Sequence, residues 1–88
     1  MTAEMAGTFP ALVGMEVTEV ADGMLAAWLV VRPELHAPNG YLHAGTIVTL
    51  ADTLCGLGCR IMVPEGATGF TTIELKANFL GTAREGVI

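Results

Sequence analysis

Two residues in the middle of the chain, Asp52 and His43, could do chemistry. Asp52 lies inside the apolar run TIVTLADTLCGL, and His43 precedes that run. A carboxylate buried without a partner costs several kcal/mol, so Asp52 needs either a structural partner or a chemical role. The chemical role would be that of a general base or a nucleophile. The structural alternatives are a solvated position or a hydrogen bond with Thr49 or Thr53.

The residues HAGT, from His43 to Thr46, add a second chemical feature. A helix that begins there presents free backbone N–H groups, with the positive end of the helix dipole behind them. Such a terminus can polarise a carbonyl and stabilise an oxyanion. With a carboxylate that activates water, these groups fit acyl transfer. The alternative role for His43 is a helix cap or a loop contact.

His43 and Asp52 are nine residues apart. On an ideal helix this spacing is about 13.5 Å of rise and about 180° of rotation, so the two side chains cannot meet within one helix. If they share a site, they come from two copies of the chain, related by a two-fold axis with the helices antiparallel. The spacing therefore predicts a shared site only in a homo-oligomer.

The elements around this segment follow from the apolar pattern. The stretch from Leu12 to Val20 alternates like a half-buried strand, with its apolar positions at Val13, Met15 and Val17. Ala21 to Gly23 is typical of a hairpin turn. The run from Met24 to Arg32 then predicts a second strand, covered on both faces.

A long helix should follow a Pro- and Gly-containing loop. Apolar residues recur at the helical period from Ala44 to Met62. Gly45, Gly56 and Gly58 are interpreted as places where another backbone comes close. Alternation returns from Phe70 to Leu80 and predicts another strand, and the last residues, Val87 and Ile88, look like the start of one more.

Composition excludes several classes of protein. The chain of 88 residues is 52% hydrophobic and 15% charged, which is too apolar for a disordered segment and allows one domain. The longest fully apolar run, Met24 to Val31, is too short for a spanning helix of about 20 residues, so no membrane is expected. A net charge of −5 without a basic cluster argues against nucleic acid as a partner.

The two cysteines, Cys55 and Cys59, suit no disulfide framework. A zinc site needs four ligands, and only His36 and His43 could join them. We therefore expect buried, reduced thiols and no metal. With no signal peptide at the N-terminus, this predicts a cytoplasmic protein.

The motif NGYLHAGTIVTLADT, followed by GFTTIELKANFLGTAREG, resembles the hotdog-fold thioesterases of the phenylacetate-degradation (PaaI-like) type. That family has an "HGG…AD" segment at the start of the central helix and a "T-x-E-L…NFL…A…G" strand after it. The resemblance covers Gly40 to Ile88 clearly and the preceding hairpin more loosely. It implies an α+β fold: a curved antiparallel sheet wrapped around one long central helix.

The resemblance also implies roles for individual residues. Asp52 matches the catalytic carboxylate, base or nucleophile, and His43 matches the histidine at the mouth of the helix. Ala44 replaces a glycine whose backbone N–H is the oxyanion donor, and the N–H remains in place. Thr72 matches a hydroxyl that orients the water or the carboxylate.

Two further positions are expected to contact substrate, Gly45 and Asn39. The family usually has an orienting Asn or Gln six residues before the histidine, where this chain has Ala37. Asn39 is the candidate substitute.

The implied reaction is hydrolysis of an acyl-CoA thioester to a carboxylic acid and CoA, without a metal or redox cofactor, in a homodimer or homotetramer. Lys76 and Arg84 are the candidates for contacts with CoA phosphates, or are simply solvated charges. The family continues with two further strands, so residues 1–88 are expected to be a single hotdog domain that is incomplete at its C-terminus, and unstable or molten alone. Three alternatives are a non-catalytic acyl-CoA or acyl-carrier binding module, a dehydratase, which the missing proline-flanked histidine loop disfavours, and an inactive fragment.

Overall fold

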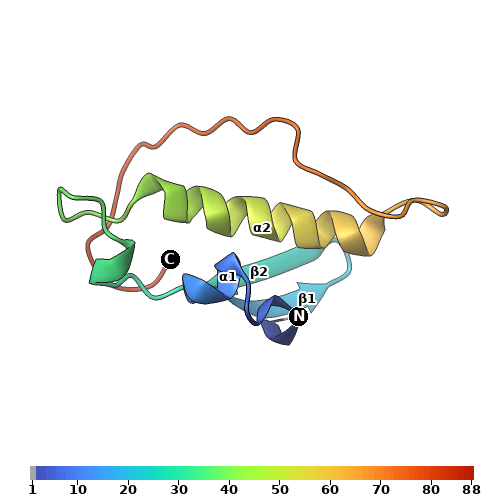
Figure 1. Ribbon diagram of the computed structural model, residues 1–88, viewed down its shortest axis with the longest axis horizontal. Coiled ribbons are helices and arrows are strands. Elements are labelled where there is room, and N and C mark those ends of the chain that lie inside the picture. The colour runs from blue at the N-terminus through green and yellow to red at the C-terminus, as the bar shows by residue number, and fades with distance from the viewer. Residues whose placement is uncertain (1) are drawn as a thin grey trace.

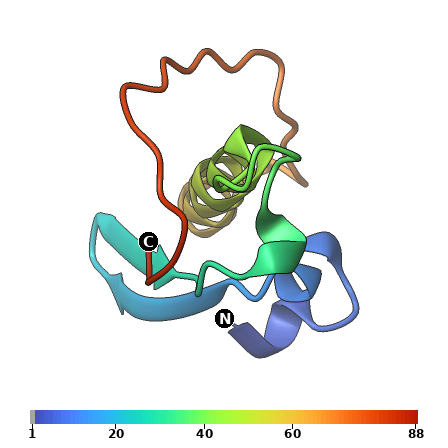
Figure 2. The same cartoon turned by 90° about the vertical axis from the view of Figure 1, so that its left-hand side faces the viewer.

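The computed structural model describes residues 2–88. A hairpin of two strands lies along one side of a long helix, and the chain after the helix returns along its other side (Figure 1; Figure 2). The elements in chain order are η1 (Thr2–Met5), α1 (Phe9–Leu12), β1 (Glu16–Ala21), β2 (Met24–Trp28), η2 (Pro33–Leu35) and α2 (Ala44–Met62). The α+β class expected from the sequence is therefore observed.

Strands β1 and β2 pair antiparallel around the predicted turn. Gly23 in that turn has a φ of 74°, which a residue with a side chain rarely adopts. A bulge at Thr18 shifts the register, so that Val17 pairs with Ala27 and Glu19 with Ala26. The first strand begins later than its pattern predicts because Phe9–Leu12 form helix α1. The missed signal was Pro10, since proline favours the first turn of a helix.

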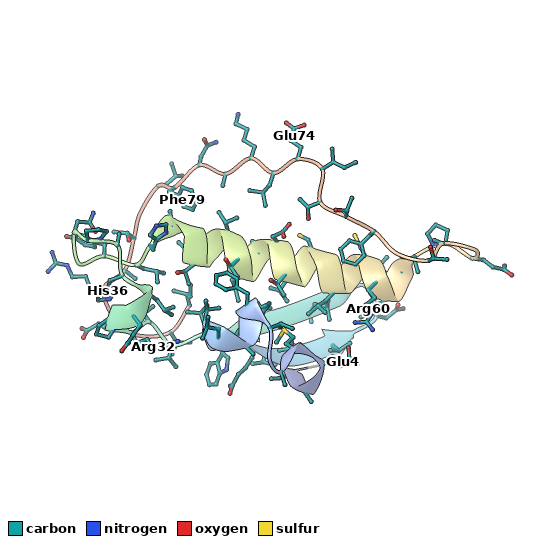
Figure 3. All side chains as sticks on the ribbon, viewed as in Figure 1. Glu4, Arg32, His36, Arg60, Glu74 and Phe79 are labelled. Carbon is teal, nitrogen blue, oxygen red and sulfur yellow. The ribbon has the colours of Figure 1, made fainter. Side chains whose placement is uncertain are left out.

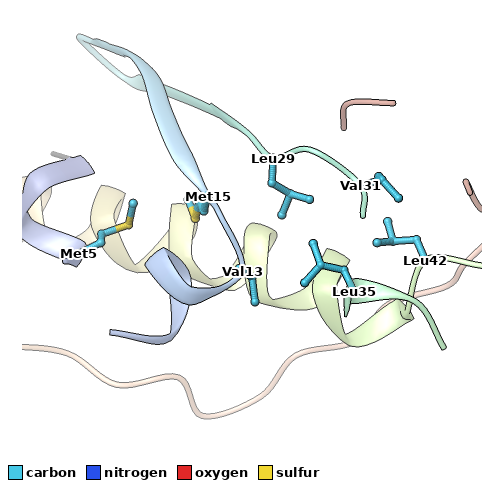
Figure 4. Close-up of a cluster of buried hydrophobic side chains, with 7 residues drawn as sticks. All are labelled: Met5, Val13, Met15, Leu29, Val31, Leu35 and Leu42. Atoms are coloured by element: carbon cyan, nitrogen blue, oxygen red, sulfur yellow. The ribbon is translucent and has the colours of Figure 1, made fainter. Parts of the chain in front are cut away.

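The core lies between the hairpin, the loop after it and α2 (Figure 4). Its members are buried apolar side chains from the N-terminal part and the loop: Met5, Val13, Met15, Leu29, Val31, Leu35 and Leu42. Helix α2 adds partly buried side chains at the helical period: Ile47, Leu50, Leu54 and Leu57. The burial of alternate residues from Val13 to Val17 and the helical period of α2 agree with the prediction.

The outer face of the second strand is open. Trp28 and Val30 are 44% and 57% exposed, while Leu29 between them is fully buried. The prediction that this strand is covered on both faces is wrong, because within residues 2–88 only its inner face has a packing partner. A continuous apolar run indicates what a strand could bury, and neighbouring elements decide what it does bury.

Helix α2 spans Ala44–Met62, as predicted. Contrary to the expectation from run length, its 19 residues and mean hydropathy of 1.2 would suffice to cross a membrane. The core helix of a soluble protein passes the same test. Length and hydropathy therefore do not distinguish a membrane span from a core helix.

The segment from Phe70 to Leu80 is extended but belongs to no strand. The predicted strand is wrong in this respect, because the segment lies on the side of α2 away from the hairpin and has no neighbouring strand beside it (Figure 2). Pairing resumes at the end of the chain. Val87 forms an antiparallel bridge with Val30, and Ile88 exchanges two backbone hydrogen bonds with Leu29 of 3.0 and 3.1 Å.

Candidate active site

Asp52 receives a hydrogen bond from a distant part of the chain. The Thr72 hydroxyl donates to Asp52 Oδ1 over 2.9 Å, although the residues are 20 positions apart. Of the two helix threonines considered as alternative partners, Thr49 donates to the Gly45 carbonyl, one turn earlier in α2, over 2.8 Å, and no bond between Thr53 and Asp52 is found within residues 2–88. The carboxylate is half-buried. Helix α2 and the 70–80 segment together thus orient one oxygen of Asp52.

Asp52 lines a groove of about 740 Å³ between α2 and the 70–80 segment, here called the Asp52 groove. Its helix wall is mostly apolar and consists of Ile47, Val48, Ala51, Cys55, Gly56 and Cys59. Phe70 closes one part, since a Cβ on Gly56 would lie 3.0 Å from its ring. Glu74 also lines this groove, with its carboxylate pointing away from α2 (Figure 3).

His43 caps α2 with its own side chain. Its Nδ1 accepts a hydrogen bond from the Gly45 N–H over 2.8 Å. The neutral ring therefore carries its proton on Nε2, an assignment from the bonding partner. The Thr46 N–H donates to the His43 carbonyl over 2.9 Å, and no bond from the Ala44 N–H is found within residues 2–88. This N–H remains available to polarise a carbonyl.

His43 and Gly45 line a second groove of about 630 Å³, here called the His43 groove. Its other walls come from α1, the loop after β2, and the first two turns of α2. Asp52 lines the first groove and is absent from this one. The two predicted catalytic side chains thus face different grooves of one chain, as their spacing along the helix requires.

Asn39 belongs to neither groove. Its Oδ1 accepts a hydrogen bond from the Tyr41 N–H over 3.1 Å, a local turn contact. The Arg84 guanidinium lies 4.3 Å from the centre of the Tyr41 ring and donates to its hydroxyl over 2.8 Å. Arg84 thus fixes the loop before the helix. Lys76 lines the Asp52 groove.

Two interpretations of the helix need correction. Cys55 and Cys59 are unpaired, as expected, but exposed rather than buried, because their side of α2 faces the open Asp52 groove. Within one chain the helix glycines adjoin side chains rather than another backbone: a Cβ would meet the His43 ring at Gly45, the Phe70 ring at Gly56 and Leu25 at Gly58. In residues 2–88, no three side chains of the metal-binding types gather as a site.

Comparisons with known proteins agree with the resemblance at the level of the superfamily. Residues 39–88 match the model of the thioesterase superfamily. A 1,4-dihydroxy-2-naphthoyl-CoA hydrolase of Listeria monocytogenes is 30% identical over 86% of this chain and 61% of its own length. A proofreading thioesterase EntH of Cronobacter turicensis is 32% identical over all of this chain and 64% of its own length.

A crystal structure of a mutant thioesterase from Pseudomonas aeruginosa has a TM-score of 0.89 at 29% identity. The similarity covers 97% of this chain and 61% of the Pseudomonas chain. A thioesterase structure from Haemophilus influenzae, at 24% identity and a TM-score of 0.88, supports the fold. The chain belongs to the thioesterase superfamily and has the hotdog fold. It spans about three fifths of the length of several of these relatives.

Proposed function

We propose that the protein hydrolyses acyl-CoA thioesters, as a member of the phenylacetate-degradation type within its superfamily. The observation that carries the proposal is the 2.9 Å bond between Thr72 and Asp52, which holds a helix carboxylate at the wall of an apolar groove. The CoA thioester in the name of the Listeria relative supports the choice of substrate class.

In this mechanism the Ala44 N–H polarises the thioester carbonyl and stabilises the oxyanion that develops on it. The bond between the Gly45 N–H and Nδ1 orients the His43 ring, so that Nε2–H is directed away from the helix and can donate to substrate. In one route Asp52 takes a proton from water as the water attacks the carbonyl carbon; in the other Asp52 itself attacks, and water then hydrolyses the resulting acyl–aspartyl anhydride. In both routes the C–S bond breaks, the CoA sulfur takes up the proton that water releases, and the acyl group leaves as the carboxylic acid.

The complete site is proposed to combine two copies of the chain. His43, which directly precedes Ala44 at the helix start, lines one groove, and Asp52 with Thr72 lines another. Two α2 helices packed antiparallel about a two-fold axis would place each Asp52 near the partner's helix start. A homodimer would hold two such sites, and a tetramer four.

The test is hydrolysis of a panel of acyl-CoA substrates, with CoA release followed by chromatography. Asp52→Asn keeps the shape of the side chain but cannot act as base or nucleophile, so activity should fall about 10²-fold or more. Asp22→Asn, in the hairpin turn, is the matched control and should keep full activity. Turnover retained by folded Asp52→Asn protein would rule out the assignment.

A non-catalytic acyl-CoA binding module is the second candidate. It is favoured by Asn39, whose amide oxygen serves a local turn instead of a substrate or water. Binding of acyl-CoA without turnover by the wild-type protein would select this candidate.

A further inference from the structure

Helix α1 carries two large apolar side chains that are mostly exposed. Phe9 and Leu12 are 59% and 71% exposed. Both line the His43 groove, on the wall that faces the start of α2. Because Val13, directly after the helix, is buried, the exposure of these two side chains indicates a surface that contacts something outside this chain's own core.

The floor of the same groove is rigid. Val13 and Leu35 line it and are only 5% and 7% exposed, because they belong to the core. His43 and Gly45, at the start of α2, line the same groove. An apolar group that lies against Phe9 and Leu12 can therefore be continuous with a carbonyl at the helix start. The volume of about 630 Å³ is within the range of small-ligand sites.

Hydrogen bonds to three of its carbonyls hold helix α1. The Val13 N–H donates to the Phe9 carbonyl over 3.1 Å, and the Met15 N–H donates to the Pro10 carbonyl over 3.0 Å. Arg32 Nη2, from the loop after β2, donates to the Leu12 carbonyl over 2.8 Å. Arg32 also lines the groove, and Figure 3 shows it at the end of the molecule where α2 begins. The wall is thus preorganised, which reduces the cost of ordering it when a ligand binds.

We infer that Phe9 and Leu12 form the acyl-binding wall of the site and limit the size of the acyl group, and that Arg32 positions this wall. The inference rests on the proposed function, since it assigns the acyl half of that substrate. The ligand class is an apolar acyl group attached to CoA. Its carbonyl lies at the helix start, and its far end lies against α1.

The first experiment measures binding, which needs no turnover. Non-hydrolysable S-alkyl-CoA thioethers with two-, six- and ten-carbon chains are titrated into the full chain by calorimetry. Phe9→Ala and Leu12→Ala should each weaken binding of the six-carbon ligand about tenfold, because one lost contact in an apolar pocket discriminates by about that factor or more. Both should weaken the ten-carbon ligand less, because the enlarged groove admits it. Leu80→Ala removes a side chain that is 98% exposed and lines neither groove, and should change nothing.

Arg32 is tested as a positioning residue. Arg32→Met removes the donor to Leu12 and should reduce the ratio of six- to two-carbon affinity, while Arg32→Lys should restore part of it. A loss of affinity that is equal for all chain lengths, or no rescue by lysine, would overturn the positioning role.

The two proposals fail in different ways. If the wild-type protein binds the thioethers with the predicted size dependence but hydrolyses no acyl-CoA, the wall stands and the hydrolase proposal fails. If hydrolysis proceeds and the two alanine variants keep the wild-type order of affinities, the acyl-binding role of Phe9 and Leu12 is refuted and the hydrolase proposal is not. Failure of folded wild-type protein to bind any thioether would also overturn the acyl-binding role of Phe9 and Leu12.

Discussion

Replacement of Gly45 by alanine should separate activity from stability. A Cβ at this position would lie 2.9 Å from His43 Nδ1 and 3.1 Å from Cε1. The shorter distance must grow to an ordinary contact of at least 3.4 Å, so the ring has to move by about 0.5 Å. That movement lengthens and weakens the 2.8 Å bond from the Gly45 N–H that orients the ring.

The two effects on stability oppose each other. Alanine in place of glycine stabilises a helix by about 0.5–1 kcal/mol. Loss of a helix cap costs about 0.5–2 kcal/mol. The net change in the free energy of unfolding should therefore lie between a gain of about 0.5 and a loss of about 1.5 kcal/mol. Activity has no such compensation, and a misplaced catalytic group costs up to about 10²-fold, so we expect a loss of tenfold or more.

Gly58→Ala is the matched control in the same helix. Its Cβ would meet Leu25 Cδ1 at 3.6 Å, an ordinary contact, so this variant should gain the full helix propensity and keep its activity. Each 1 kcal/mol corresponds to a shift in Tm of about 4–8 °C in a domain of this size. Urea denaturation and acyl-CoA hydrolysis are measured on both variants. The reasoning is refuted if Gly45→Ala is stabilised as much as Gly58→Ala and retains full turnover.

Three further predictions concern the site and the segment after α2. Thr72→Val removes the donor to Asp52 while keeping the side-chain shape, so kcat should fall about tenfold, the equivalent of about 1.4 kcal/mol. The urea midpoint should change little, and an unchanged kcat would contradict the orienting role of Thr72. Mixing His43→Ala and Asp52→Asn subunits should restore about half the wild-type activity per mixed dimer if the site is shared; no recovery would assign both residues to one chain's own site. Trypsin should cleave after Lys76, in the unpaired extended segment, before it cleaves after Arg60 in α2, and cleavage in the reverse order, seen by mass spectrometry, would show that the segment is protected.

Local patterns predicted the elements whose partners are close in sequence. The helical period from Ala44 to Met62 gave the bounds of α2, and the turn at Asp22 and Gly23 placed the hairpin. The bridge at Val87 also follows the predicted strand start. These predictions are confirmed because periodicity and turn chemistry depend on residues within a few positions of one another. Helix α1 was missed although Pro10 marked it.

The resemblance supplied what the patterns lacked. It pointed to the hotdog fold and, through Thr72, to a partner for Asp52 that spacing could not suggest. The structure places the two side chains in contact, and their roles in catalysis stay predictions until the variants are measured.

By itself the sequence determined the helix, the hairpin and the separation of His43 from Asp52. Only the tertiary structure decided which apolar faces are buried against another element. Cys55 and Cys59 are exposed, and the 70–80 segment is extended without a strand partner. The His43 groove also acquires its outer wall from α1, more than 30 residues away in the chain. The physical reason is that an apolar pattern states which side of an element can be buried, whereas burial itself depends on what packs against that side from elsewhere in the chain.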